Sequence, residues 1–206
     1  MPFRKWVNRM DKVKSILLAG VGGQGTILVS KILCKGLIEA GYDVKMSEIH
    51  GMAQRGGSVS TQVRYGENVQ SPIIGVGQAD ILVAFEKMEA VRYASFLKPE
   101  GVAVINKLEI VPMTVASGKE KYPEGLLEAM QEQFRVYSFD AMQAALSVGS
   151  PKVMNIVLFG AMVAAFPVLQ SVDWESIIRA TVPEKFKELN VSAFEKGREL
   201  VLQNQE

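Results

Sequence analysis

Short apolar runs alternate with longer amphipathic stretches along the chain, the pattern of strands followed by helices. Residues 15–19 form a continuous apolar run, as expected of a strand covered on both faces. Residues 26–40 carry apolar side chains at helical spacing, and residues 44–49 resemble a second strand. The first 50 residues therefore predict a β–α–β unit, which implies a parallel sheet.

The same alternation continues to the end of the chain. Further strands are predicted at residues 58–64, 80–85, 102–106, 108–116 and 134–139, and helices at 86–97, 124–133 and 141–147. Residues 98–101 read as a turn, and Asp140 is a good N-cap. From residue 153 the pattern is mainly helical: an apolar run over 153–170, then 174–180 and 184–203. The last helix should line one face with Phe186, Leu189, Phe194, Leu200 and Val201.

The fold class that follows is α/β, with a Rossmann-like, mostly parallel sheet flanked by helices and a helical C-terminal part. We expect a single domain over residues 1–206, with residues 1–13 as a lead-in. No stretch of signal-peptide character precedes it, so we expect a cytoplasmic protein. The run 153–170 holds Asn155 and Pro167, whereas a membrane span needs about 20 clean apolar residues. No membrane partner is predicted.

The amino-acid composition excludes several classes of binding site. Lys and Arg number 23 and Asp and Glu 22, a net charge of +1, so general nucleic-acid binding has no electrostatic support. One Cys cannot form an internal disulfide or hold an iron–sulfur cluster, which takes about four Cys ligands. One His excludes a His-rich zinc site. No catalytic residue and no metal ligand is predicted, and Cys34 reads as a core residue.

A glycine loop joins the first strand to the first helix. Gly20-x-Gly22-x-x-Gly25 matches the dinucleotide fingerprint, in which backbone N–H groups at a helix N-terminus attract a phosphate. Glu48 is the only good candidate for the acidic residue that binds a ribose. No Lys stands where a phosphate-binding P-loop needs one, which argues against nucleotide hydrolysis. The alternative is that the glycines only allow close packing, or contact another subunit.

A second glycine-rich loop follows the second strand, at residues 50–57. The carboxyl ends of parallel strands share one sheet edge, so this loop should lie beside the first. Arg55 is suited to bidentate pairing with a phosphate or carboxylate. The alternative is an exposed turn, with His50 as a hydrogen-bonding residue. The candidate cofactor-binding residues of the two loops are Gly20, Gly22, Gly23, Gln24, Gly25, Gln54, Arg55, Gly56 and Gly57.

A third segment opens the apolar run. Asn155 lies among apolar residues and should find a partner, either a backbone group or another chain. Gly160, Ala161, Ala164 and Ala165 permit close approach of another helix. Core packing and a homodimer interface both explain these small residues.

These segments together resemble the gamma subunit or domain of the 2-oxoacid:ferredoxin oxidoreductases. The motifs are residues 20–25, residues 51–59, and residues 152–155 followed by 158–161. Residues 51–57, Gly-Met-Ala-Gln-Arg-Gly-Gly, favour the indolepyruvate branch over the pyruvate branch. The resemblance extends from about Lys14 to nearly the end of the chain.

What the resemblance implies is an accessory subunit of a larger enzyme. A large partner subunit would carry thiamine diphosphate and iron–sulfur clusters, decarboxylate a 2-oxoacid, pass electrons to ferredoxin and release an acyl-CoA. This chain contains no thiamine-binding Gly-Asp-Gly motif. The two glycine loops become candidates for contact with CoA or with the large subunit. The alternatives are a free-standing NAD(P)-dependent oxidoreductase, in which Glu48 binds the ribose, and a pure scaffold subunit.

Overall fold

The computed structural model describes residues 13–50 and 57–203. At its centre is a sheet in the order β2-β3-β1-β4-β5-β6. The strands are β1 (Lys14–Val21), β2 (Asp43–His50), β3 (Ser58–Gly66), β4 (Ala79–Ala84), β5 (Leu97–Asn106) and β6 (Arg135–Phe139). Strands β1, β4, β5 and β6 pair in parallel, whereas β3 is antiparallel to both β1 and β2. The α/β class is confirmed.

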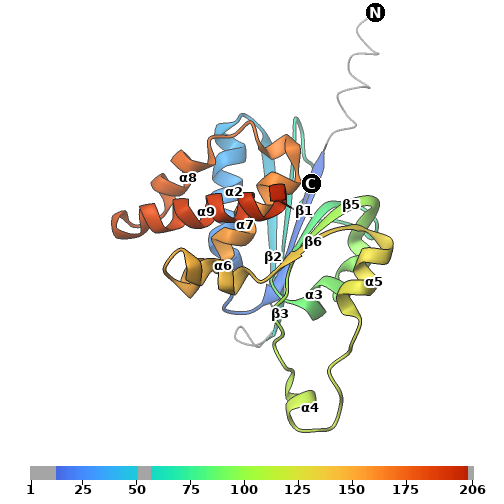
Figure 1. The fold of residues 1–206 in the computed structure, drawn as a ribbon. Helices are drawn as coiled ribbons and strands as arrows, with labels where there is room; N and C mark the ends of the chain where they lie inside the picture. The colour runs from blue at the N-terminus through green and yellow to red at the C-terminus, as the bar shows by residue number, and fades with distance from the viewer. Residues whose placement is uncertain (1–12, 51–56, 204–206) are drawn as a thin grey trace, which may run out of the picture.

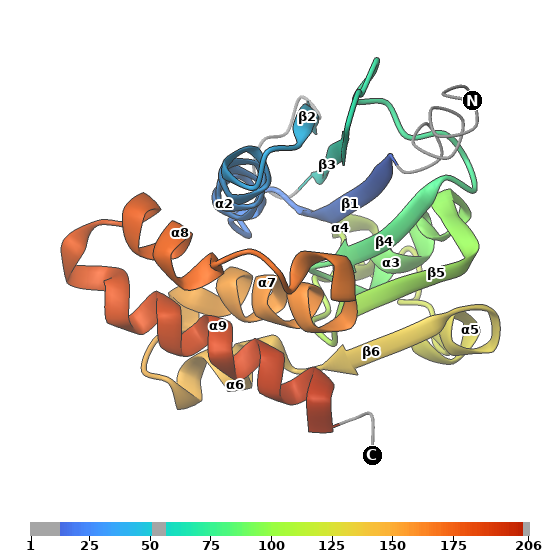
Figure 2. The same ribbon diagram turned by 90° about the horizontal axis from the view of Figure 1, so that it is seen from above.

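Helices cover both faces of this sheet, as Figures 1 and 2 show. One face carries α2 (Thr26–Glu39), α6 (Ala141–Ser147), α7 (Met154–Ala165), α8 (Trp174–Thr181) and α9 (Lys187–Leu202). The other carries α3 (Lys87–Arg92) and α5 (Leu126–Gln133), while α4 (Met113–Ala116) lies away from the sheet. Single 3₁₀ turns occupy Ala94–Phe96, Pro151–Val153, Pro167–Leu169 and Glu184–Phe186.

Alternate residues of the central strand supply two separate cores. Ile16 and Leu18 of β1 pack with the α2, α7 and α9 side, and Leu17 packs with the α3 and α5 side. A strand covered on both faces needs this continuous apolar run. Helix α7 is buried along its whole length because it lies between the sheet and α9, which explains its uniformly apolar sequence. None of the described helices is long and apolar enough to cross a membrane.

Helices α7 and α9 approach each other more closely than side chains normally allow. A Cβ atom at Gly160 would lie 1.9 Å from the Phe194 carbonyl oxygen. A Cβ atom at Gly197 would lie 1.9 Å from the Val157 carbonyl oxygen. The small residues of α7 therefore serve packing within the chain, the first of the two explanations that the sequence left open.

Several sequence predictions need correction. Strand β2 runs in the same direction as β1, but β3 lies between them, so the first β–α–β unit is split. Residues 98–101, predicted as a turn, lie within β5, where the pairing with β4 shifts register. The strand predicted at 108–116 is absent, and the short helix α4 stands there instead. Phe186 is 41% exposed, whereas Phe194 and Val201 of the predicted face are buried.

The α7–α9 contact predicts a large effect from one methyl group. In the Gly197→Ala variant the added methyl group pushes the backbones of α7 and α9 apart. Overpacking of this kind costs about 3 kcal/mol of unfolding free energy. Urea denaturation followed by circular dichroism measures the loss. The control is Ser192→Ala on the exposed side of α9, expected to change stability by less than about 0.5 kcal/mol. Equal stability of the two variants would contradict the close contact.

Candidate ligand site at the carboxyl edge of the sheet

The glycine loop and both ends of the second loop lie at one edge of the sheet. β1, β4, β5 and β6 end at this edge, β2 ends there at His50, and β3 begins there at Ser58. The Gly22 N–H donates to the Gly57 carbonyl oxygen at 2.9 Å. The structure therefore brings Gly57 to the glycine loop, as predicted. Gln54, Arg55 and Gly56 lie outside the described residues.

The glycines of the first loop have different surroundings. A Cβ at Gly20 would lie 2.8 Å from the Gln24 Oε1 atom, so this glycine serves close packing. Gly23 has φ +103°, and a Cβ there would meet nothing within 4 Å. Gly25 has φ +82° and is the N-cap of α2. The loop is packed at its base and open at Gly23.

The side chain of Gln24 holds the loop in this conformation. Its Oε1 accepts from the Val21 N–H at 2.7 Å, and its Nε2 donates to the Phe85 carbonyl oxygen at 2.9 Å. The buried Asn106 donates to that same carbonyl oxygen at 3.1 Å and accepts from the Ala141 N–H at 3.0 Å. The Gln24 N–H also donates to the Val21 carbonyl oxygen at 3.2 Å, so both the carboxamide and the backbone N–H of Gln24 are bonded within the protein.

The N-terminus of α2 carries backbone N–H groups to which the described residues supply no hydrogen bond. Within residues 13–50 and 57–203, no acceptor bonds to the backbone N–H groups of Gly23, Gly25, Thr26 or Ile27. The first turn of α2 holds no acidic residue, and Gly25 supplies no side-chain cap. Free N–H groups at the positive end of a helix dipole form an anion site. The loop is therefore suited to bind a phosphate or carboxylate group.

Asn155 joins the glycine loop to the C-terminal helices. Its Nδ2 donates to the Gly25 carbonyl oxygen at 3.1 Å, and a Cβ at Gly25 would lie 2.6 Å from that nitrogen. The partner of Asn155 is a backbone group of the same chain, one of the two alternatives from the sequence. The start of α7 thus fixes the start of α2.

Glu48 does not occupy the position of a ribose-binding acid. That acid belongs at the end of the strand adjacent to β1, and here β3 separates β2 from β1. The Glu48 carboxylate accepts a hydrogen bond from the Ser30 hydroxyl of α2 at 3.3 Å. The split β–α–β unit therefore removes the geometric support for dinucleotide binding.

Cys34 packs against the core, as predicted, and burial raises the pKa of its thiol to about 11. A cysteine in this state is a poor nucleophile and metal ligand. As the only cysteine it does not fit an iron–sulfur cluster. No group of three or more His, Cys, Asp or Glu residues in the described ranges is arranged to hold a metal ion.

Sequence reasoning missed a buried carboxylate next to Phe85. Glu86 is 1% exposed and caps α3 by accepting from the Glu89 N–H at 3.0 Å. Its other oxygen accepts from the Tyr122 hydroxyl at 2.7 Å and from the Ile110 N–H at 3.3 Å. Burial, together with the bond to Glu86, raises the pKa of Tyr122. An acidic residue between a strand and a helix was the available signal, but residue 86 was assigned to the helix itself.

A second buried carboxylate fixes the start of β3. Glu89 of α3 is 4% exposed, accepts from the Ser58 hydroxyl and pairs with Arg92 at 3.1 Å. Ser58 directly follows Gly57, whose carbonyl oxygen bonds to the glycine loop. The end of the second loop is therefore held on both sides.

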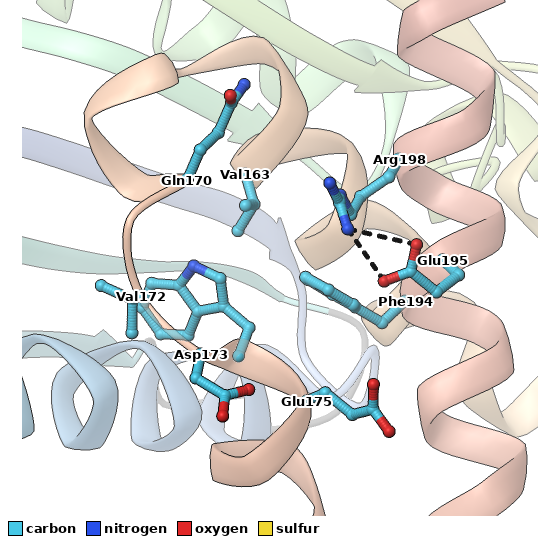
Figure 3. A pocket seen from close by; sticks show the side chains of 9 residues that line it. Val163, Gln170, Val172, Asp173, Glu175, Phe194, Glu195 and Arg198 are labelled. Atoms are coloured by element: carbon cyan, nitrogen blue, oxygen red, sulfur yellow. Dashed lines mark hydrogen bonds and ion pairs between the residues drawn. The ribbon is translucent and has the colours of Figure 1, made fainter.

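A separate cavity of about 180 Å³ lies beside α8 and α9 (Figure 3). Trp174 and Phe194 form part of its wall. Its charged groups are already engaged: Arg198 pairs with Glu195 at 3.0 Å, and Asp173 caps α8. None of the predicted site residues lines it.

Comparisons with known proteins agree with the earlier resemblance. Residues 15–200 match the family model described as pyruvate ferredoxin/flavodoxin oxidoreductase. Indolepyruvate oxidoreductase subunit IorB of Pyrococcus horikoshii is 36% identical over 192 residues, covering 90% of this chain and 95% of the relative.

Two solved structures have a similar fold. The gamma subunit of a keto/oxoacid ferredoxin oxidoreductase from Geobacter sulfurreducens has a TM-score of 0.69 at 28% identity, over 92% of this chain and 99% of that one. A 2-oxoglutarate:ferredoxin oxidoreductase from Magnetococcus marinus, with 2-oxoglutarate, coenzyme A and succinyl-CoA bound, has a TM-score of 0.71. It is 21% identical, over 94% of this chain and 32% of that one, a likeness in fold alone.

The hydrogen bonds of Asn106 at the carboxyl edge of the sheet predict that replacing this residue lowers the stability of the fold. Asn106→Leu leaves the buried Ala141 N–H without an acceptor, which costs about 1–3 kcal/mol of unfolding free energy. Gln131→Leu on the exposed side of α5 makes the same chemical change and should cost less than about 0.5 kcal/mol. Urea denaturation of both variants checks the difference. A stability of Asn106→Leu equal to that of the control would show that the network contributes nothing.

Proposed function

The chain belongs to the pyruvate ferredoxin/flavodoxin oxidoreductase family, and we propose that it is the small, accessory subunit of a 2-oxoacid:ferredoxin oxidoreductase acting on indolepyruvate or a related aryl-pyruvate. Its partner is a large subunit that carries thiamine diphosphate and iron–sulfur clusters and passes electrons to ferredoxin. The proposal places the complex in the cytoplasm, where a single unpaired cysteine stays reduced.

The side chains of this chain indicate which catalytic groups its partner must supply. One half-buried cysteine with a raised pKa and one histidine cannot supply cluster ligands and a catalytic set. The buried side chains of Glu86 and Asn106 at the carboxyl edge, and the partly buried side chain of Gln24, are bonded to the backbone of this chain. We therefore propose that the chain is inactive alone and completes an active site held by its partner.

The single observation that carries the ligand assignment is the set of backbone N–H groups at Gly23, Gly25, Thr26 and Ile27, which bond to no acceptor in the described part of the chain. Such groups suit the phosphates of CoA, the acyl acceptor of the proposed reaction. A net charge of +1 provides no basic surface, so local donors must hold an anionic ligand. Arg55, Gln54 and Gly56 of the second loop complete the proposed contact, and a solved enzyme of similar fold has coenzyme A bound.

A pure scaffold subunit is the second candidate. The close packing of Gly20 and Gly25 favours it, because these glycines would be needed without any ligand. The two candidates differ only in whether the open end of the loop, at Gly23, meets CoA.

Assembly is tested by co-expressing the chain with the cognate large subunit. We expect one complex by size-exclusion chromatography, and oxidoreductase activity with indolepyruvate, CoA and ferredoxin only when both chains are present. Separate elution, together with activity of the large subunit that this chain leaves unchanged, would contradict the proposed function.

Contact with CoA is tested by a matched pair at Gly23. Gly23→Asp and Gly23→Asn carry the same backbone strain and meet no neighbouring atom within 4 Å at Cβ, so they differ only in charge. A carboxylate beside these N–H groups repels a phosphate and accepts the hydrogen bonds that the phosphate would otherwise receive. We expect the KM for CoA to be at least about tenfold higher for Asp than for Asn, with the KM for the 2-oxoacid alike. Equal KM values for CoA would favour the scaffold subunit.

A further inference from the structure

The connection between β5 and α5 is unusually long. Residues 107–125, here called the arm, contain only α4 and extend beyond the carboxyl edge of the sheet (Figure 1). Most connections in compact domains have about 4–6 residues, and long ones are usually functional or disordered. The arm therefore calls for a physical explanation of its length and of what holds it.

Glu86 and Lys87 hold the two ends of the arm next to the sheet, residues 108–110 and Tyr122, here called its root. The Glu86 carboxylate accepts from the Ile110 N–H at 3.3 Å, on the outgoing limb, and from the Tyr122 hydroxyl at 2.7 Å, on the returning limb. The Lys87 N–H donates to the Leu108 carbonyl oxygen at 3.1 Å, and the Lys87 ammonium pairs with Glu109. One buried oxygen thus joins the two limbs to the end of β4.

Capping α3 does not by itself explain why this carboxylate is buried. Asp140 caps α6 and Asp173 caps α8 while both remain exposed. Burying a carboxylate costs free energy that hydrogen bonds must offset. At Glu86 the additional bonds all go to the arm. The chain therefore fixes the direction in which the arm leaves the sheet.

Beyond its root the arm contributes little to this chain's own packing. Val111 is 52% exposed, and residues 116–121 are exposed. Of residues 111, 112 and 115–121, none belongs to either hydrophobic core. The arm carries as many lysines as glutamates, namely Lys107, Lys119 and Lys121 against Glu109, Glu120 and Glu124. Balanced charge with exposed apolar surface suits a protein partner and does not suit nucleic acid or an anionic membrane.

We propose that the arm is a docking element for the large subunit. Its first residue follows Asn106, which shares the Phe85 carbonyl oxygen with Gln24 of the glycine loop. The arm and the loop therefore leave the same edge of the sheet on one bonded framework. This inference rests on the proposed function: a large subunit that presents CoA to the loop also lies within reach of the arm.

The test compares two exposed valines. Val111→Asp places a charge on the arm, and Val76→Asp places one between β3 and β4 at the opposite edge, where Val76 is 72% exposed. Full-length variants are titrated against the isolated cognate large subunit by surface plasmon resonance. We expect the Kd of Val111→Asp to be at least about tenfold higher than that of the unmodified chain, and the Kd of Val76→Asp to be unchanged.

A second variant tests the root. Tyr122→Phe removes one donor to Glu86 and keeps the aromatic ring, and we expect a Kd increase of about threefold or more with an unchanged circular dichroism spectrum. Unchanged Kd values for both arm variants would overturn the docking role and leave the proposed function standing. No binding by the unmodified chain would overturn both. A Val111→Asp effect confined to self-association would identify a second copy as the occupant and overturn the proposal.

Discussion

The carbonyl oxygen of Phe85 is the point on which the candidate site depends. It accepts one hydrogen bond from Gln24 and one from Asn106, and these two amides in turn bond to the backbone of Val21 and Ala141. Four segments that are distant in sequence meet through one atom. The conformation of the glycine loop, and with it the orientation of its backbone N–H groups, follows from this arrangement because Gln24 lies in the middle of the loop. The next residue, Glu86, extends the same framework to α3 and to the arm.

The C-terminal helices also help to fix the glycine loop at this edge of the sheet. Helix α7 is buried along its length and is held against α9 at Gly160 and Gly197, where backbone meets backbone. At its N-terminal end Asn155 bonds to the Gly25 carbonyl oxygen. A rigid pair of helices therefore sets the position of the first turn of α2. Pre-organised donors lose less entropy when a ligand binds, so this packing favours the ligand contact that we propose for the loop.

Much of the fold could be predicted from the sequence, and the remainder has identifiable physical causes. The apolar run of α7, the strand before the glycine loop and the need of Asn155 for a partner all follow from local pattern. The place of β3 between β1 and β2 does not, because strand pairing is a non-local choice. The sequence assigns Gln24 to the glycine loop but does not reveal its hydrogen-bond partner Phe85, which lies 61 positions away. The burial of Glu86 likewise depends on Tyr122, 36 positions along the chain.

The proposed role, a subunit that shapes a site for its partner, rests on the scarcity of catalytic side chains and on the fixed backbone of the glycine loop. Hydrogen–deuterium exchange on the assembled complex, with and without CoA, tests this account most directly. The account predicts that CoA slows exchange in peptides covering residues 22–27 and leaves the turn at residues 75–78, on the opposite edge, unchanged. Unaltered exchange at residues 22–27, with protection by CoA found only elsewhere in the complex, would contradict it.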